Sequence, residues 1–181
     1  IGEVHVAEQG GSAMIAMTRG VENELGSSNA VVRALAGSPW ILPALLDPDS
    51  GNIEKAYSVL KRYNESMRFS VCYLLDTKGD VIASSNRDLP ESFIGKNYAF
   101  RPYFKEAITG KTTGYMAAGV TSHERGFYAA QPVRDDSGKI VGVVAIKKNV
   151  DAAKAILRSY PTSFLINPDG IVFMAGSPAM V

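Results

Sequence analysis

The spacing of the apolar side chains changes once along this chain, and the change constrains its fold class. Before residue 46, residues three and four positions apart form one stripe of a long α-helix, namely Met14, Met17, Val21, Leu25, Ser28, Val32 and Leu35. From Phe69 onward, runs rich in β-formers are separated by Gly-containing turns, as in antiparallel strands. Helices followed by consecutive strands indicate an α+β fold with an antiparallel sheet.

Breakers and capping residues bound the expected helices. Pro39 and Pro43 interrupt the N-terminal helical region, because proline cannot continue a helix interior. A polar loop at 47–52 precedes the next helix, for which Ser50 or Asn52 is the expected N-cap. Later in the chain, a short helix and a closing helix capped by Asp151 are expected at 103–109 and 151–160.

The strands are bounded by turn residues in the same way. A turn at 76–79 and another at 135–138 each combine Asp with Gly, which favours tight reversals. The five strands expected to form the central antiparallel sheet are 69–75, 80–85, 114–121, 126–133 and 139–148.

One hairpin pattern occurs twice. Residues 73–84 and 164–175 both read as apolar strand, Asx-x-x-Gly turn and apolar strand. The recurrence predicts a second module of the same type, although two unrelated hairpins can also look alike. The expected organisation is a helical region at 1–46, a module at 47–160 and the start of a second module at 161–181. Because the chain begins with Ile and carries no signal peptide, we expect a piece of a longer protein.

Composition and motifs argue against several classes of function. Nineteen basic and eighteen acidic residues give a net charge of +1, which provides no global field for nucleic acid. The lone Cys72 cannot form an internal disulfide and is expected to be a buried thiol. Neither His5 nor His123 has partners at metal-ligand spacing, and no nucleophile or phosphate-loop motif occurs. We therefore expect no catalytic residue, no metal, no cofactor and no nucleic-acid partner.

Two stretches concentrate the chemistry that remains. Residues 97–104 read Asn-Tyr-Ala-Phe-Arg-Pro-Tyr-Phe, and residues 121–128 read Thr-Ser-His-Glu-Arg-Gly-Phe-Tyr. Guanidinium groups present paired N–H donors that match the two oxygens of a carboxylate. The combination of arginines, hydroxyls and aromatic rings therefore predicts a receptor for a small organic anion.

The order of these motifs resembles a known family. The hairpin, the 97–104 stretch, Gly119-x-Thr121-Ser122, Arg125-Gly126-Phe127-Tyr128 and Gly142-Val143-Val144 follow the order seen in extracytoplasmic double-Cache (PDC, PAS-like) sensors. The chain is most similar to the sensors of four-carbon-dicarboxylate histidine kinases. The resemblance implies a long N-terminal helix packed on a membrane-distal, PAS-like module that holds the ligand, with a smaller module after it. It also implies an extracytoplasmic location and membrane spans outside this sequence. The apolar stripe of the N-terminal helix itself calls for a partner, either a sheet or a second copy of the helix, and the second case would be a homodimer.

The resemblance further implies a set of ligand contacts. Arg101 and Tyr103 would face the ligand from the start of the short helix, and Tyr128 would line the pocket from a strand. Thr121 and Ser122 match a hydroxyl pair that holds a carboxylate. On a regular strand these two residues point to opposite faces, and Thr121 is the favoured one because it shares a face with small residues.

Lys147 distinguishes between ligand classes. Amino-acid sensors of the same superfamily typically carry an acidic residue at this position, where it pairs with the ligand's ammonium group. A lysine repels an ammonium group and favours a second carboxylate. We therefore expect a dianion, for example a dicarboxylate, bridged between Arg101 and Lys147.

Two alternatives remain open at the level of the sequence. The first is a chemoreceptor-type domain for amino acids or quaternary amines, with an aromatic cage built from Tyr98, Tyr103, Tyr115 and Tyr128. The second is a structural dimerisation module with an empty pocket. Each tyrosine can also be a core aromatic residue, and Arg101 and Lys147 can also extend into solvent. Arg125 is expected in a turn, as a solvated or gating residue.

Overall fold

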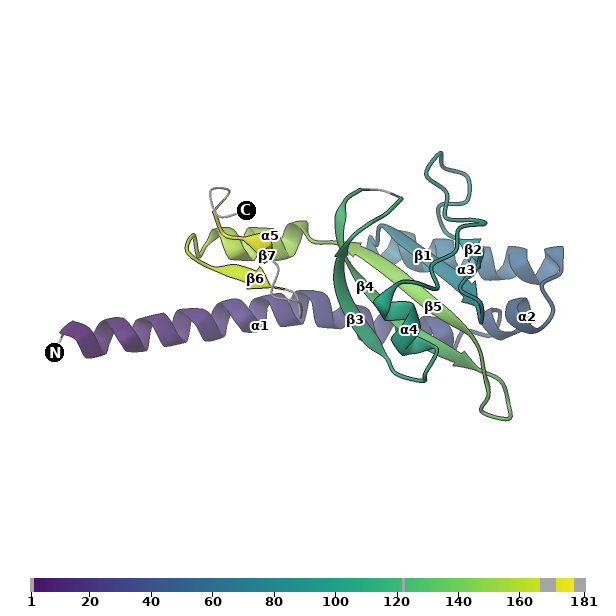
Figure 1. The fold of residues 1–181 in the computed structure, drawn as a ribbon, viewed down its shortest axis with the longest axis horizontal. Helices are drawn as coiled ribbons and strands as arrows, with labels where there is room; N and C mark the ends of the chain where they lie inside the picture. Colours follow the sequence, from purple (N-terminus) through teal and green to yellow (C-terminus); the bar gives the residue numbers. More distant parts are fainter. Residues whose placement is uncertain (1, 122, 167–171, 178–181) are drawn as a thin grey trace. The chain divides into compact units, whose positions relative to one another are not determined.

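The computed structural model describes residues 2–121, 123–166 and 172–177, and its elements form two compact units (Figure 1). One unit is Ser28–Asn149, and the other joins the first part of α1 to the segment from Val150 onward. The helices are α1 (Gly2–Ala36), α2 (Ile41–Leu46), α3 (Ser50–Met67), α4 (Pro102–Ala107) and α5 (Asp151–Arg158). The strands are β1 (Val71–Asp76), β2 (Val81–Ser84), β3 (Thr113–Ala118), β4 (Arg125–Arg134), β5 (Ile140–Asn149), β6 (Phe164–Ile166) and β7 (Val172–Ala175).

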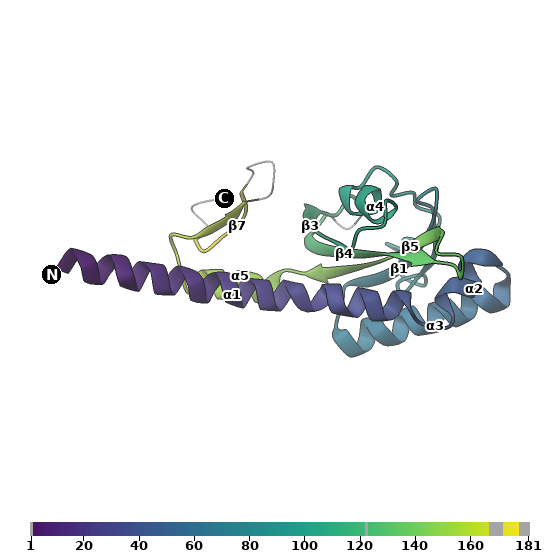
Figure 2. The ribbon, with the colours of Figure 1, turned by 90° about the horizontal axis from the view of Figure 1, so that it is seen from below.

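The larger unit is built on a five-stranded antiparallel sheet in the order β2-β1-β5-β4-β3. The expected α+β class and five-stranded antiparallel sheet are therefore confirmed. Helix α4 lies on one face of this sheet, and α2 and α3 lie on the other (Figure 2). The register places Lys147 of β5 directly between Val71 of β1 and Tyr128 of β4. Because side chains alternate along a strand, these three residues lie on one face of the sheet, the face of α4.

The stripe predicted on α1 is buried only in part. Val21, Leu25, Ser28, Val32 and Leu35 are buried, whereas Met17 is half-buried and the Met14 side chain is 62% exposed. Within the smaller unit, Gly20 lies against Ile156 of α5, where an added Cβ would lie 3.4 Å from the isoleucine Cγ2. The stripe predicted from the sequence is therefore buried from Val21 onward, and its first turn is not.

Two predicted helix caps are also wrong. The N-cap of α3 is Asp49, whose Oδ1 accepts the N–H of Asn52 at 2.6 Å, rather than Ser50 or Asn52. Asp, Ser and Asn cap helices about equally well, so composition alone could not separate these neighbours. The N-cap of α5 is Val150, and Asp151 is the first helical residue, where its charge still favours the helix N-terminus.

The predicted ends of β3 and β4 are also in error. Strand β3 ends at Ala118 instead of residue 121, and a turn at Gly119–Glu124 follows it. The N–H of Gly119 donates to the carbonyl of Glu124 at 2.8 Å, in register with the β3–β4 pair. The N–H of His123, which has a positive φ of 54°, donates back to the carbonyl of Gly119 at 2.9 Å and closes the turn. Arg125 is the exposed first residue of β4, rather than a turn residue.

The second hairpin forms as a pair of short strands. β6 and β7 pair antiparallel, with Phe164 opposite Ala175 and Leu165 opposite Met174. The turn expected at 167–170 lies outside the described residues. The hairpin contacts α5 through β7, which gives the smaller unit its own packed core around Phe173 and Met174.

The face of the sheet opposite Tyr73 carries the single cysteine of the sequence. Cys72 has no exposed surface and lies opposite Ile146 in the register of β1 and β5. Burial raises the pKa of its thiol, because the thiolate would lose hydration. The prediction of a buried thiol is confirmed.

Candidate ligand-binding site

The segment between β2 and α4 is fastened to the β1–β2 turn. Nδ2 of Asn97 donates to the carbonyl of Lys78 at 3.0 Å and to Oδ1 of Asp80 at 2.8 Å. The N–H of Tyr98 donates to the carbonyl of Gly79 at 2.8 Å. Gly79 has a positive φ of 85°, and a Cβ there would lie 2.6 Å from the backbone nitrogen of Ala99. These contacts hold the 97–104 stretch against the sheet.

A buried amide shapes the preceding part of the same segment. Oδ1 of Asn86 accepts from the hydroxyl of Ser84 at 2.6 Å and from the N–H of Phe93 at 3.2 Å. Its Nδ2 donates to the carbonyl of Glu91 at 3.0 Å. Every polar group of the Asn86 side chain is thus used to fold residues 84–93, and Phe93 is placed over the sheet.

Aromatic rings form the floor and wall of the site. The hydroxyl of Tyr73 donates to the hydroxyl of Tyr103 at 2.8 Å, and Tyr73 also makes edge contacts with Phe93 and Tyr98. Because the Tyr103 oxygen accepts this bond, its own hydrogen is available for a ligand oxygen. Burial raises the pKa of Tyr73, Tyr98, Tyr103 and Tyr128, so all four phenols stay protonated and remain donors at neutral pH.

Arg101 is the N-cap of α4 and reaches over the sheet. Its Nη2 donates to the carbonyl of Ala118 at 2.8 Å, and its Cζ lies 5.5 Å from the ring centre of Tyr128. The Nε atom of Arg101 is buried and has no hydrogen-bond partner among the described residues. An unpartnered buried N–H is costly, so this donor is the polar group of the site that most clearly calls for an acceptor.

Thr121 enters the site from the β3–β4 turn. Its Oγ1 and the hydroxyl of Tyr98 are 2.8 Å apart and share one hydrogen bond. The sequence placed Thr121 on the face of a continuing strand, whereas the strand has already ended three residues earlier. Ser122, the other predicted hydroxyl, lies outside the described residues.

A small cavity lies where these groups meet. It is lined by Phe93, Tyr98, Arg101, Tyr103, Gly119, Val120, Thr121 and Tyr128. Its free volume is about 10 Å³, which is about the space of one water molecule. The cavity must therefore enlarge before it admits an organic acid.

Lys147 lies beside this cavity on the same face of the sheet, but it is not one of the lining residues. Its side chain is 2% exposed, and its Nζ lies 3.9 Å from Oε2 of Glu124. It runs across Gly126, where an added Cβ would lie 2.9 Å from the lysine Cε. Burial lowers the pKa of Lys147, Glu124 opposes that shift, and the charge of Arg101 adds to it.

The structure therefore brings together five of the eight predicted residues around one cavity, which are Tyr98, Arg101, Tyr103, Thr121 and Tyr128. Lys147 adjoins them, and the half-buried Tyr115 lies opposite Tyr128 in the register without lining the cavity. Sequence reasoning missed Phe93 and Val120, which carry no polar signal. It also missed Glu124, which lies in the quoted 121–128 stretch next to the arginine that was considered instead.

Among the described residues, no group of three or more His, Cys, Asp or Glu side chains is placed to hold a metal ion.

Comparison with known proteins identifies the family. The chain is 31% identical over 143 residues to the C4-dicarboxylate transport sensor protein DctB of Pseudomonas aeruginosa, which covers 78% of this chain and 23% of the relative. It superposes on the sensor domain of the V. cholerae histidine kinase DctB with a TM-score of 0.89 and 30% identity, over 99% of this chain and 70% of that one. The chain belongs to the DctB-type PDC sensor domains. The resemblance noted in the sequence is thereby confirmed.

Other neighbours share the PDC fold of the DctB-type domains. The ligand-binding domain of the P. aeruginosa amino acid chemoreceptor PctC, in complex with GABA, matches with a TM-score of 0.72. Identity is 23% over 96% of this chain and 78% of that one, which supports a common fold alone. No family model matches the chain.

The chain spans about a quarter of the length of the curated DctB relatives it matches. In the part of the chain that the structure describes, none of the helices combines the length and the apolar character that crossing a membrane requires. The chain is a sensor domain of this family.

Proposed function

We propose that this sensor domain binds a small dianionic organic acid, such as a four-carbon dicarboxylate. The observation that carries the proposal is the buried, unpartnered Nε of Arg101 beside a cavity that Lys147 adjoins on the same face of the sheet. One carboxylate would be held by Arg101, Tyr103 and Thr121. The other would pair with the Lys147 ammonium group. The names of the DctB relatives, which are sensors of C4-dicarboxylate transport, support this ligand class.

The charges around the cavity favour an anion over a zwitterion. Arg101 and Lys147 are close enough for the charge of the arginine to lower the pKa of the lysine. An amino-acid ammonium group placed near Lys147 would add a third positive charge at low solvent exposure, which is costly. A second carboxylate would instead relieve the repulsion between the two cations.

Ligand binding requires the pocket to open and close. Residues 86–104 and the β3–β4 turn both contribute walls to a cavity that now holds about one water molecule. A dicarboxylate that bridges Arg101 of the loop and Lys147 of the sheet would draw the two against each other. The ligand shifts the conformational equilibrium only by its difference in affinity for the two arrangements.

The remaining expectations stay predictions within this proposal. The parent protein would be a membrane-anchored histidine kinase whose sensor faces the outside of the cytoplasm. The helical region 1–46 would form the homodimer and carry the signal, with the ligand in module 47–160 and a second module from residue 161. Crosslinking across α1 in the presence and absence of ligand would test the dimer.

Calorimetry and thermal shift on the purified chain test the ligand class. Succinate, fumarate and malate should bind and raise the melting temperature, whereas amino acids and quaternary amines should not. At a ligand concentration of 100 times Kd, mass action stabilises the folded state by about 2.7 kcal/mol. Arg101→Ala and Lys147→Met should each weaken succinate binding at least tenfold, because each leaves one carboxylate without its cation.

Matched substitutions control for general effects of charge. Arg62 and Lys111 are exposed cations of the same unit and lie outside the cavity. Arg62→Ala and Lys111→Met should keep the wild-type affinity for succinate. Binding of amino acids but not of dicarboxylates, or unchanged succinate binding in Arg101→Ala, would refute the proposal.

A further inference from the structure

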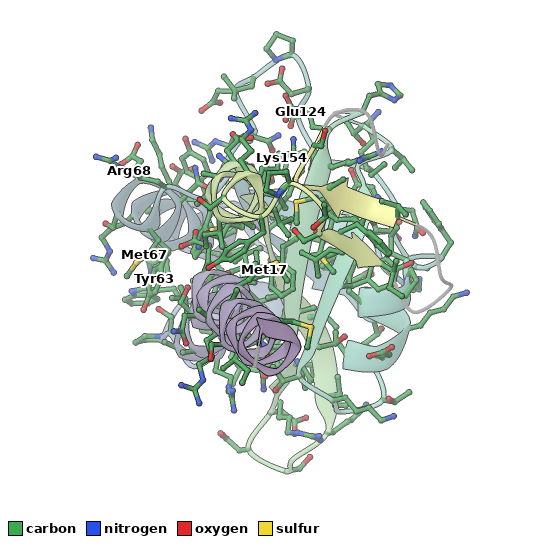
Figure 3. All side chains as sticks on the ribbon, turned by 90° about the vertical axis from the view of Figure 1, so that its left-hand side faces the viewer. Met17, Tyr63, Met67, Arg68, Glu124 and Lys154 are labelled. Atoms are coloured by element: carbon green, nitrogen blue, oxygen red, sulfur yellow. The ribbon has the colours of Figure 1, made fainter. Side chains whose placement is uncertain are left out.

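The β3–β4 turn brings a carboxylate of the protein to the cation that the second carboxylate of the ligand needs. Glu124 lies at the base of the turn, where its backbone carbonyl accepts the N–H of Gly119, and its side chain extends to within 3.9 Å of the Lys147 Nζ. Figure 3 labels Glu124 beside the loop that joins β3 to β4. The Glu124 side chain is 75% exposed, whereas that of Lys147 is 2% exposed. The acidic group can therefore leave easily, but the lysine cannot.

The same turn also roofs the cavity. Gly119, Val120 and Thr121 line it, and Thr121 shares a hydrogen bond with the hydroxyl of Tyr98. Arg101 adds another contact, because its Nη2 donates to the carbonyl of Ala118 at the end of β3. The turn is thus held over the cavity by polar contacts to residues that a dicarboxylate would itself engage.

We propose that Glu124 is a built-in competitor for the ligand, so that a dicarboxylate must displace its carboxylate from Lys147 to bind. The inference rests on the proposed function. Displacing Glu124 would release one of the contacts that hold the β3–β4 turn down. A monocarboxylate could fill the Arg101 side of the site but would leave the Glu124–Lys147 pair intact. Glu124 would thereby make the domain respond to diacids in preference to monoacids.

The expected size of this competition is modest. An ion pair with one exposed partner is formed for only part of the time, and apparent affinity scales with the fraction of molecules in the competent state. Removing the competitor should therefore tighten succinate binding by about 2- to 5-fold. The affinity for a monocarboxylate such as propionate should stay within about twofold, because its binding does not require the pair to break.

Three variants separate competition from simple charge repulsion. Glu124→Gln removes both the charge and the ion pair. Glu124→Asp keeps the charge but shortens the side chain by one methylene, which removes it from contact with Lys147. Asp136→Asn removes a charge from the exposed hairpin turn at the other end of β4 and β5 and serves as the control. Titration calorimetry with succinate and propionate at one ionic strength gives Kd for each protein.

The outcomes are distinct. Tighter succinate binding in both Glu124 variants, with propionate and Asp136→Asn unchanged, supports the competitor. A gain in Glu124→Gln that is absent from Glu124→Asp assigns the effect to long-range charge and overturns it. Unchanged or weaker succinate binding in both variants also overturns it, while the proposed function stands. Failure of the wild-type chain to bind any dicarboxylate refutes the proposed function and this inference together.

Discussion

The ring of Tyr103 lies parallel to that of Tyr128, with an interplanar angle of 1° and 5.2 Å between the ring centres. Tyr103 belongs to α4 and Tyr128 to β4, so this stack fixes the short helix to the sheet. The hydrogen bond from Tyr73 then restricts the rotation of the Tyr103 hydroxyl group, so it determines where that hydroxyl points. The arrangement presents a rigid donor to the cavity before any ligand arrives.

Replacing Tyr73 by Phe should weaken both stability and binding. The change leaves the ring contacts in place and removes the donor to Tyr103, which should lower the free energy of unfolding by about 1 kcal/mol. Succinate binding should also weaken, because the Tyr103 hydroxyl is free to rotate. Urea denaturation and calorimetry measure the two effects. Tyr160→Phe, in the smaller unit, is the control, and equal effects of the two substitutions would contradict the role of Tyr73.

Replacing Gly126 by Ala should disturb Lys147 directly. The new Cβ would lie 2.9 Å from the Cε of Lys147 and 3.2 Å from the backbone oxygen of Lys148, so the lysine chain must move. Crowding of this kind costs about 1–3 kcal/mol of folding free energy. We expect weaker succinate binding and a lower denaturation midpoint.

A second glycine offers the matched control for this prediction. Gly26 lies in the exposed part of α1, with nothing within 4 Å of an added Cβ. Gly26→Ala should raise stability by about 1 kcal/mol, since Ala is the better helix former, and leave binding unchanged. Wild-type affinity in Gly126→Ala would show that the position of the lysine chain does not limit binding.

Replacing Lys147 by Met should stabilise the unliganded domain by about 1 kcal/mol, because the cost of taking a cation out of water is often not fully offset by its ion pairs. The gain should shrink as the pH rises. In the folded state the pKa of Lys147 is lowered below its usual 10.5, chiefly by burial, so the unfolded chain binds more protons between the two values. The free energy of unfolding of the wild type therefore rises, relative to that of the variant, as the pH increases between the folded and unfolded pKa values of Lys147.

Denaturation of both proteins from pH 7 to pH 10 measures this difference. The tyrosines are common to the two proteins, so their own titration cancels in the comparison. A stability gap that stays constant over this range would show that the burial of Lys147 does not perturb its ionisation. A dicarboxylate, by contrast, favours the charged lysine, so its binding should weaken as the pH rises through the pKa of Lys147.

Replacing Gly79 by Ala should dislodge the 97–104 stretch from the β1–β2 turn. The residue has a positive φ, and the new Cβ would meet the backbone of Ala99 at 2.6 Å. Strain and crowding together should cost about 1–3 kcal/mol. Hydrogen exchange should show faster exchange at Tyr98, whose N–H bonds to the Gly79 carbonyl. Protection of Tyr98 equal to that in the wild type would contradict the prediction.

The sheet could be predicted from sequence because its signals are local. Alternating apolar residues and Asp-Gly turns define strands within a few residues of their own positions, and the side of Lys147 follows from its alternation with Val143 and Ala145. Strand ends are harder. Residues 119–121 could equally continue β3, and the bond from the N–H of His123 back to the carbonyl of Gly119 makes them a turn instead.

The contacts of the site depend on residues distant in the chain. The pairing of Tyr73 with Tyr103 and of Glu124 with Lys147 requires the register of three strands and the placement of α4. No sequence pattern encodes these distances. The side chains that line the cavity could thus be named in part through the family resemblance, whereas the smallness of the cavity and the role of Glu124 could not.

The burial of Cys72 has a practical consequence for measuring the motion of the pocket. Since the only thiol of the chain is inaccessible and its ionisation is suppressed, thiol-reactive probes should ignore the native protein. A cysteine introduced at the exposed position Phe100 would then carry a fluorophore or spin label at a single place, without prior removal of the natural residue. The chain is in this sense ready for spectroscopy of its own loop.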